Sequence, residues 1–156
     1  MTGNFRTPTT PPSAADQLEH QLHIIKTAQI ELGKACAVLR HADRVNDAKR
    51  FEDLYDHRFT AQEAVHPMAS AIHFGPGLRT TPPPAGFGRK DGLVWTAIAR
   101  LTNAVVCLAK AGSQDRADEI TCLVMSVFTQ EAFFDSVREA SLDLLMPRGR
   151  FVPRSV

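Results

Sequence analysis

The sequence predicts an all-α protein, a helical bundle of about five to six helices. Apolar residues recur at spacings of three and four along most of the chain, and no stretch alternates convincingly with the period of two that marks a half-buried strand. The chain also matches itself at a fixed offset, so that residues 32–64 align with residues 101–132 when Ala61 is skipped. Such a match is typical of duplicated helical modules, and it leaves open that two related helical hairpins are joined by a linker.

Composition limits the protein to one domain or two very small ones. The 156 residues are 44% apolar, which is enough for a real core and argues against disorder over the whole chain. The three cysteines, Cys36, Cys107 and Cys122, fall inside apolar helical patterns, so we expect buried, reduced thiols. The first residues lack the apolar region of a signal peptide, and a cytoplasmic location is the expectation.

The first helical unit is predicted over residues 13–74, after a disordered Thr/Pro-rich tail at 1–12. Ser13 is expected to cap a long amphipathic helix at 13–43. Its apolar stripe comprises Leu18, Leu22, Ile25, Leu32, Cys36 and Leu39. The seven-residue spacing from Leu18 to Leu39 also suits a coiled-coil seam, although a core-facing stripe is the commoner explanation. A second helix is expected at 45–65 and a short third helix at 68–74, separated by Pro67.

A Pro/Gly-rich linker at 75–92 is predicted to join this unit to a second helical unit at 93–146. Five glycines and four prolines in the linker exclude helix and central strand there. Asp91 is the expected cap of a helix at 92–111, which should be the most buried of the fold. Further helices are expected at 113–128 and 131–146, before a basic tail at 147–156. The last predicted stripe comprises Phe133, Val137, Ala140 and Leu144. The residues of this unit that we expect to be largely buried are Trp95, Ile98, Leu101, Leu108, Ile120 and Val124.

The predicted helix at 92–111 is long and apolar enough to raise the question of a membrane span. Arg100 and Asn103 interrupt its middle, where charged and polar groups are costly in lipid. We therefore expect a buried helix in a bundle and no membrane partner.

One hairpin resembles the repeats of the tetratricopeptide family. The pattern runs Leu101-x2-Ala104-x3-Leu108-x2-Ala111-Gly112-x4-Ala117, with small residues where two antiparallel helices approach and a glycine where the chain turns. The resemblance covers about 30 residues without the aromatic positions and closing proline of that family, and a generic helical hairpin explains the same pattern. In either case it implies a close-packed pair of antiparallel helices.

Candidate chemistry is sparse. Arg50 and His57 resemble the Arg-x6-His spacing of HEPN-type ribonucleases, a resemblance that implies phosphate stabilisation by Arg50 and proton transfer by His57. His20 and His23 lie one helical turn apart but lack an evident third metal ligand. The sequence holds no nucleotide-binding fingerprint or Ser-His-Asp arrangement. We therefore expect no enzyme activity, no metal and no cofactor.

Basic residues gather in the irregular segments, although the whole chain carries a net charge of only +1. The two tails and the linker together carry +6, which leaves −5 on the helical remainder. Candidate nucleic-acid contacts are Arg79, Arg89, Lys90, Arg148, Arg150 and Arg154.

The sequence favours a non-catalytic protein–protein interaction protein, such as an adaptor, an assembly subunit or a protein inhibitor. A protein partner is the main expectation, and a homo-oligomer stays open. The alternative is a small helical subunit of a nucleoprotein complex that contacts nucleic acid through its basic linker and tail. A HEPN-like ribonuclease is the third, weaker hypothesis.

Overall fold

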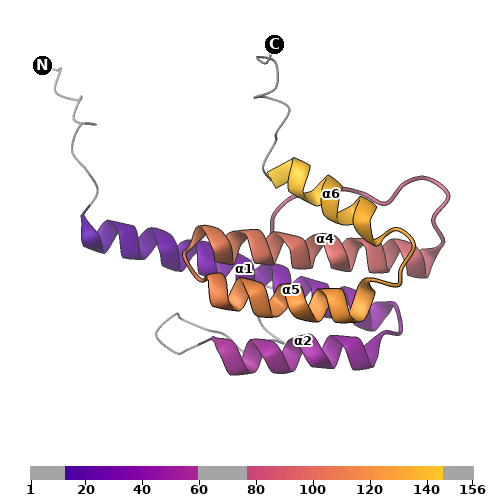
Figure 1. The fold of residues 1–156 in the computed structure, drawn as a ribbon, viewed down its shortest axis with the longest axis horizontal. Coiled ribbons are helices and arrows are strands. Elements are labelled where there is room, and N and C mark those ends of the chain that lie inside the picture. The colour runs from indigo at the N-terminus through magenta and orange to yellow at the C-terminus, as the bar shows by residue number, and fades with distance from the viewer. Residues whose placement is uncertain (1–12, 60–76, 146–156) are drawn as a thin grey trace, which may run out of the picture.

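Five helices and no strands make up the parts of the chain that the computed structural model describes, residues 13–59 and 77–145 (Figure 1). The helices are α1 (Ala14–His41), α2 (Val45–Arg58), α4 (Arg89–Lys110), α5 (Gln114–Phe128) and α6 (Phe134–Leu145). The predicted all-α helical bundle is therefore confirmed. The predicted short helix at 68–74 and both tails lie outside the described residues.

Helices α1, α2, α4 and α5 form the bundle, and α6 lies along α4 on the side away from α2 (Figure 1). The contacts between α1 and α4 give their relative direction, because Glu31 meets Arg100 while Asp43 meets Lys90. Residue numbers thus rise along α1 as they fall along α4, and the two helices are antiparallel. The first turns of α1 extend past the other helices, and Leu18 there is 56% exposed.

Two predicted helix ends can be compared with the structure at α1 and α2. α1 begins as expected after Ser13, whose Oγ accepts a hydrogen bond from the Asp16 amide at 3.1 Å. The prediction that α2 reaches residue 65 is wrong, because α2 ends at Arg58 and Phe59 adopts extended backbone angles. The Phe59 ring is buried against Tyr55. This burial against the bundle is a tertiary effect that the local helical pattern does not contain.

The third predicted helix also starts elsewhere. Gly88 precedes its first turn, so α4 begins at Arg89 and the predicted cap at Asp91 is wrong. Asp91 instead lies in the first turn, where a carboxylate interacts favourably with the helix dipole. Residues 89–92 therefore belong to α4 rather than to the predicted linker.

The last helix is shorter than predicted and buries a different stripe. It begins at Phe134 rather than at residue 131, after two backbone turns in which the Glu131 amide donates to the Phe128 carbonyl and the Phe134 amide to that of Glu131. Its buried residues are Phe134, Val137 and Ser141. Of the predicted stripe, only Val137 is buried, because α4 contacts a face rotated from the predicted one.

The two hairpins turn in the same way. Asp43 and Gly112, which occupy equivalent positions in the internal match, both have positive φ angles, of 62° and 83°. In each turn the amide of the following residue donates to the carbonyl four positions before the turn residue, at 2.8 Å. A left-handed residue at this place satisfies free carbonyls at the end of a helix. The described part of the predicted match, residues 32–59 and 101–128, therefore forms two hairpins with equivalent turns.

The matched positions are also buried alike. Fully buried equivalent pairs are Leu32 with Leu101, Ala35 with Ala104, Leu39 with Leu108, and Ala48 with Ala117. The residues predicted to form the core of the second unit are all buried, which confirms that prediction: Trp95, Ile98, Leu101, Leu108, Ile120 and Val124. The Gln62-Glu63-Ala64 part of the match lies outside the described residues.

A buried ionic cluster joins the two units. Glu31 is fully buried and accepts hydrogen bonds from Arg100 Nη1 at 3.0 Å, Asn103 Nδ2 at 2.9 Å and the Leu78 amide at 2.6 Å. Glu31 and Arg100 are separated by the same offset as the internal match, so each is the equivalent of the other. When a two-fold axis relates two units, equivalent residues of the two units can touch one another only close to that axis. An approximate two-fold axis of the bundle therefore passes between Glu31 and Arg100.

The described part of the predicted linker packs against the bundle. Gly77 has a φ of 75°, and a Cβ there would collide with the Glu31 carboxylate. Farther along, the Thr81 carbonyl accepts a hydrogen bond from Trp95 Nε1 at 3.0 Å, and the Phe87 ring packs edge-on against Trp95. This segment thus covers the N-terminal half of α4.

Helix α4 has the length and apolar composition of a membrane span, and no other described helix does. Within the described fold, 67% of the most apolar stretch of this helix is buried. α4 therefore occupies the position of a core helix, as its apolar stripe predicts.

Candidate functional site

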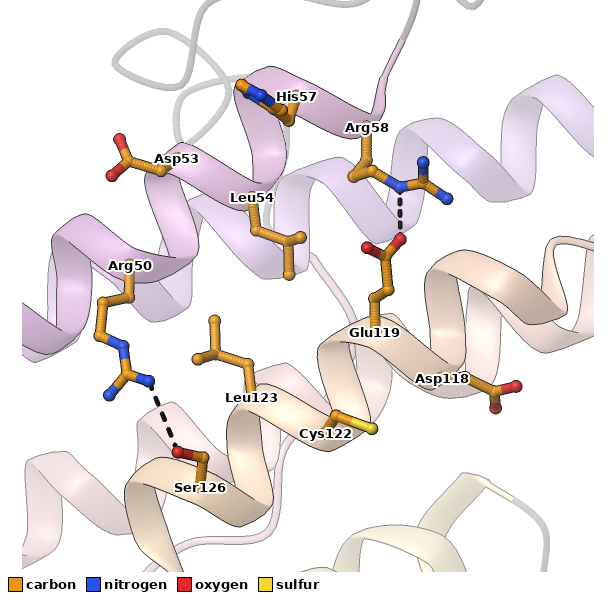
Figure 2. A pocket seen from close by; sticks show the side chains of 10 residues that line it. All are labelled: Arg50, Asp53, Leu54, His57, Arg58, Asp118, Glu119, Cys122, Leu123 and Ser126. Carbon is orange, nitrogen blue, oxygen red and sulfur yellow. Dashed lines mark hydrogen bonds and ion pairs between the residues drawn. The ribbon is translucent and has the colours of Figure 1, made fainter.

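A shallow groove of about 750 Å³ opens between α2 and α5 on the outer face of the bundle (Figure 2). We refer to it as the α2–α5 groove. Its lining residues are Arg50, Asp53, Leu54, His57, Arg58, Asp118, Glu119, Cys122, Leu123 and Ser126. All of them come from α2 or α5, so the packing of α2 on α5 sets the shape of the site.

The floor of the groove is apolar and its two ends are bridged. Leu54 and Leu123 are half-buried and point toward one another across the gap (Figure 2). At one end Arg50 Nη2 lies 3.5 Å from Ser126 Oγ, and at the other Arg58 pairs with Glu119. These two bridges also show that α2 and α5 are antiparallel.

Leu54 and Leu123 are also equivalent residues of the internal match. They form a second place where equivalent residues of the two units face each other, as Glu31 and Arg100 do in the core. Two such places define a line, so the approximate two-fold axis passes through the middle of the groove. The groove is thus the outer end of the seam between the units.

The lining residues carry more acid than base. Three carboxylates face two guanidinium groups, a net charge of −1 with His57 neutral. Arg58 offsets Glu119 directly. Asp53 and Asp118 stand on the outer walls and point away from the opposite helix (Figure 2). Each wall of the groove therefore carries at least one carboxylate, and the α5 wall has no base, whereas the α2 wall also carries Arg50 and Arg58.

Cys122 is exposed in the groove, which contradicts the prediction that all three cysteines are buried. The helical phase explains the error. α5 buries Ala117, Ile120 and Val124 against the bundle, so Cys122, which lies between the last two in the sequence, is on the opposite, outer face of the helix. Cys36 and Cys107 are buried as predicted. Burial raises the pKa of the Cys107 thiol to about 11, and it raises the pKa of the Cys36 thiol as well.

One of the three thiols is therefore expected to react in the native protein. A maleimide reagent at neutral pH should modify Cys122 rapidly, because the thiolate is the nucleophile and only this cysteine is exposed. Intact-protein mass spectrometry should count one label under native conditions and three in urea. Labelling of Cys36 or Cys107 at the rate of Cys122 would contradict the described packing.

The structure places Arg50 and His57 in the same groove, both exposed and on one side of α2. The histidine pair His20 and His23 lies elsewhere, on the exposed first turns of α1. Among residues 13–59 and 77–145, no group of three or more His, Cys, Asp or Glu side chains could hold a metal ion.

The basic candidates for nucleic-acid contact do not line the groove. Arg79 is exposed, and Arg89 Nη1 lies 3.4 Å from the His41 carbonyl at the α1–α2 turn. Lys90 pairs with Asp43 at 2.9 Å, and this hydrogen bond lowers the pKa of the Asp43 carboxyl. The tail candidates Arg148, Arg150 and Arg154 lie outside the described residues.

Sequence reasoning missed the groove, although one signal for it was present. Leu54 and Leu123 are paired in the internal match. An equivalent pair of leucines in two antiparallel hairpins marks a place where the units can meet.

Comparison of the chain with protein-family models, curated proteins and solved structures finds no match.

Proposed function

We propose that the protein is a non-catalytic interaction protein that binds a helix of a protein partner in the α2–α5 groove. The observation that carries the proposal is an open groove with an apolar floor at Leu54 and Leu123 and charged walls. An amphipathic helix binds such a groove by laying its apolar face on the floor while its flanks meet the walls. The roles of adaptor, assembly subunit and protein inhibitor all rest on this kind of contact.

The polar groups at the ends of the groove support a binding role. Arg50 and Ser126 approach one another, and Arg58 pairs with Glu119, so a polar contact spans each end of the groove. A groove that is already formed before a partner arrives is preorganised, which lowers the entropy lost on binding. The partner therefore meets a surface that needs little rearrangement.

A charged substitution in the groove should abolish partner binding without unfolding the protein. Cys122→Arg places a long cation in the groove from an exposed position, whereas Met125→Arg makes the same change at a position 40% exposed on the same helix but outside the groove. We expect the partner that co-purifies with the parent protein from its native cell to be lost from Cys122→Arg and retained by Met125→Arg.

Circular dichroism and thermal unfolding would establish that both variants keep the parent fold. Retention of the partner by a folded Cys122→Arg variant would refute the groove as the binding site. Loss of the partner from Met125→Arg alone would move the site to another side of α5.

A ribonuclease is the second candidate, because Arg50 and His57 share the groove. An arginine can stabilise the charge of a phosphate and a histidine can transfer a proton. The carboxylates of Asp53 and Asp118 disfavour an approaching phosphate, which is why this candidate ranks second. Cleavage of RNA by the parent, absent from a folded His57→Ala variant, would replace the binding proposal.

The nucleoprotein hypothesis has less support among the described residues. Lys90 is already paired with Asp43, and Arg89 lies beside the His41 carbonyl. Measuring the nucleic-acid absorbance of the protein purified from its native cell would test this alternative.

A further inference from the structure

Each wall of the α2–α5 groove carries an acid that no base neutralises within the described residues. Asp53 forms no ion pair there, and Asp118 accepts a hydrogen bond from the neutral side-chain Nε2 of Gln114 at 2.8 Å. Both side chains point away from the opposite helix in Figure 2, so they flank the groove and lie within reach of long side chains on an occupant. Of the two bases, Arg58 is paired with Glu119, whereas Arg50 contacts only the neutral Ser126 hydroxyl, so the unpaired charges of the lining are two carboxylates and one guanidinium group.

From this charge pattern we infer that the occupant of the groove is a cationic amphipathic helix of a protein partner. This inference rests on the proposed function and names the chemistry of the partner. Apolar side chains of the helix lie on Leu54 and Leu123, and Lys or Arg side chains on both flanks meet Asp53 and Asp118. The long stems of those side chains cover apolar surface while their charged ends stay hydrated.

The size of the groove fits this occupant. Its end bridges involve Arg50 and Arg58, which are separated by about 12 Å along α2 at a rise of about 1.5 Å per residue. Two turns of a partner helix span about 11 Å and present apolar residues at i, i+3 or i+4, and i+7. A short helical motif is sufficient to fill the groove.

Charge also favours a cationic occupant of the groove over an anionic one. The lining carries a net charge of −1, and Asp115 adds another exposed acid one turn before Asp118 on α5. Phosphate groups of nucleic acid or of an anionic lipid surface would meet a carboxylate on each wall, and on the α5 wall they would meet no base. A cationic helix can instead pair with Asp53 on one wall and with Asp118 on the other.

Two synthetic peptides provide the test. Both carry the same leucine stripe at i, i+3 and i+7 and are held helical by the same hydrocarbon staple, but one has lysine and the other glutamate at the flanking positions. Isothermal titration calorimetry with the full chain should give about tenfold tighter binding of the lysine peptide at low salt, because two weak charge contacts are gained rather than opposed. The preference should shrink at high salt.

Reversing the wall charges should reverse the preference. The double variant Asp53→Lys with Asp118→Lys is expected to bind the glutamate peptide more tightly than the lysine peptide. A matched control, Asp56→Lys with Glu139→Lys, makes the same change in net charge at exposed positions outside the groove. This control should keep the preference of the parent for the lysine peptide.

The outcomes separate the inference from the function it rests on. If both peptides bind with equal affinity, or if the wall variant keeps the parent preference, the cationic partner is refuted while a helix-binding groove stands. If neither peptide binds, or if Cys122→Arg leaves the binding of both unchanged, the groove does not take a helix and the proposed function fails as well.

Discussion

Replacing Arg100 with methionine is expected to lower the free energy of unfolding by about 3 to 5 kcal/mol. The change removes the ionic partner of the fully buried Glu31 carboxylate and leaves it with the Asn103 and Leu78 donors. Removing one member of a buried ion pair leaves an uncompensated charge, which costs far more than the pair itself contributes. Urea denaturation followed by circular dichroism would measure the loss.

A surface pair provides the control for Arg100. Lys90 and Asp43 form an ion pair in which both side chains are mostly exposed, so Lys90→Met should leave the urea midpoint almost unchanged. An additional Glu31→Met change in the Arg100→Met background should recover part of the lost stability, because it removes the stranded charge. Equal midpoints for Arg100→Met and the parent would show that Glu31 is not buried as described.

Truncating Leu101 to alanine is expected to cost about 2 to 5 kcal/mol, through lost burial and the cavity that remains. Leu101 is fully buried in the core, and its equivalent Leu32 is buried to the same extent. The two alanine variants should therefore lose comparable stability. Leu18→Ala, at a position 56% exposed, is the matched control and should have little effect.

Chemical denaturation would measure all three leucine variants. A loss below about 1 kcal/mol for Leu101→Ala would mean that α4 is peripheral rather than the centre of the bundle. A large difference between Leu101→Ala and Leu32→Ala would show that the two hairpins are not equivalent in packing.

The sequence predicts those features of the fold that depend on residues close together in the chain. The turns at Asp43 and Gly112 and the buried leucines follow from helical periodicity and from turn chemistry, which operate within a few residues. The position of Phe59 does not follow in this way, because its extended backbone depends on a place in the core created by the folded bundle. Helix ends that depend on tertiary packing therefore escape prediction from a single sequence.

The predicted beginning of α4 is wrong for a different reason. Glycine content assigns Gly92 to the end of a linker, but this residue lies inside the first turn of the helix. Gly88 precedes the helix in extended conformation, a position where glycine is well tolerated. Glycine content alone does not distinguish the residue before a helix from one in its first turn.

The groove and the ionic cluster depend on the relative placement of the two units. In the sequence Arg100 is recognised only as a charged residue within an apolar helix. Its pairing with Glu31 cannot be predicted, because no local pattern connects the two residues. The error at Cys122 was avoidable, since its phase relative to Ile120 and Val124 already places it on the outer face. Arg50 and His57 can be recognised on one helix, but two of the acidic residues that share their groove come from the other hairpin.

Hydrogen exchange measured by mass spectrometry, on the protein with and without its co-purified native partner, tests most directly whether the α2–α5 groove is the functional surface. We expect added protection over residues 50–58 of α2 and 118–126 of α5, which line the groove, and little change in α6. Protection confined to α6 or to the exposed first turns of α1, with none in α2 and α5, would show that the groove is not the functional surface.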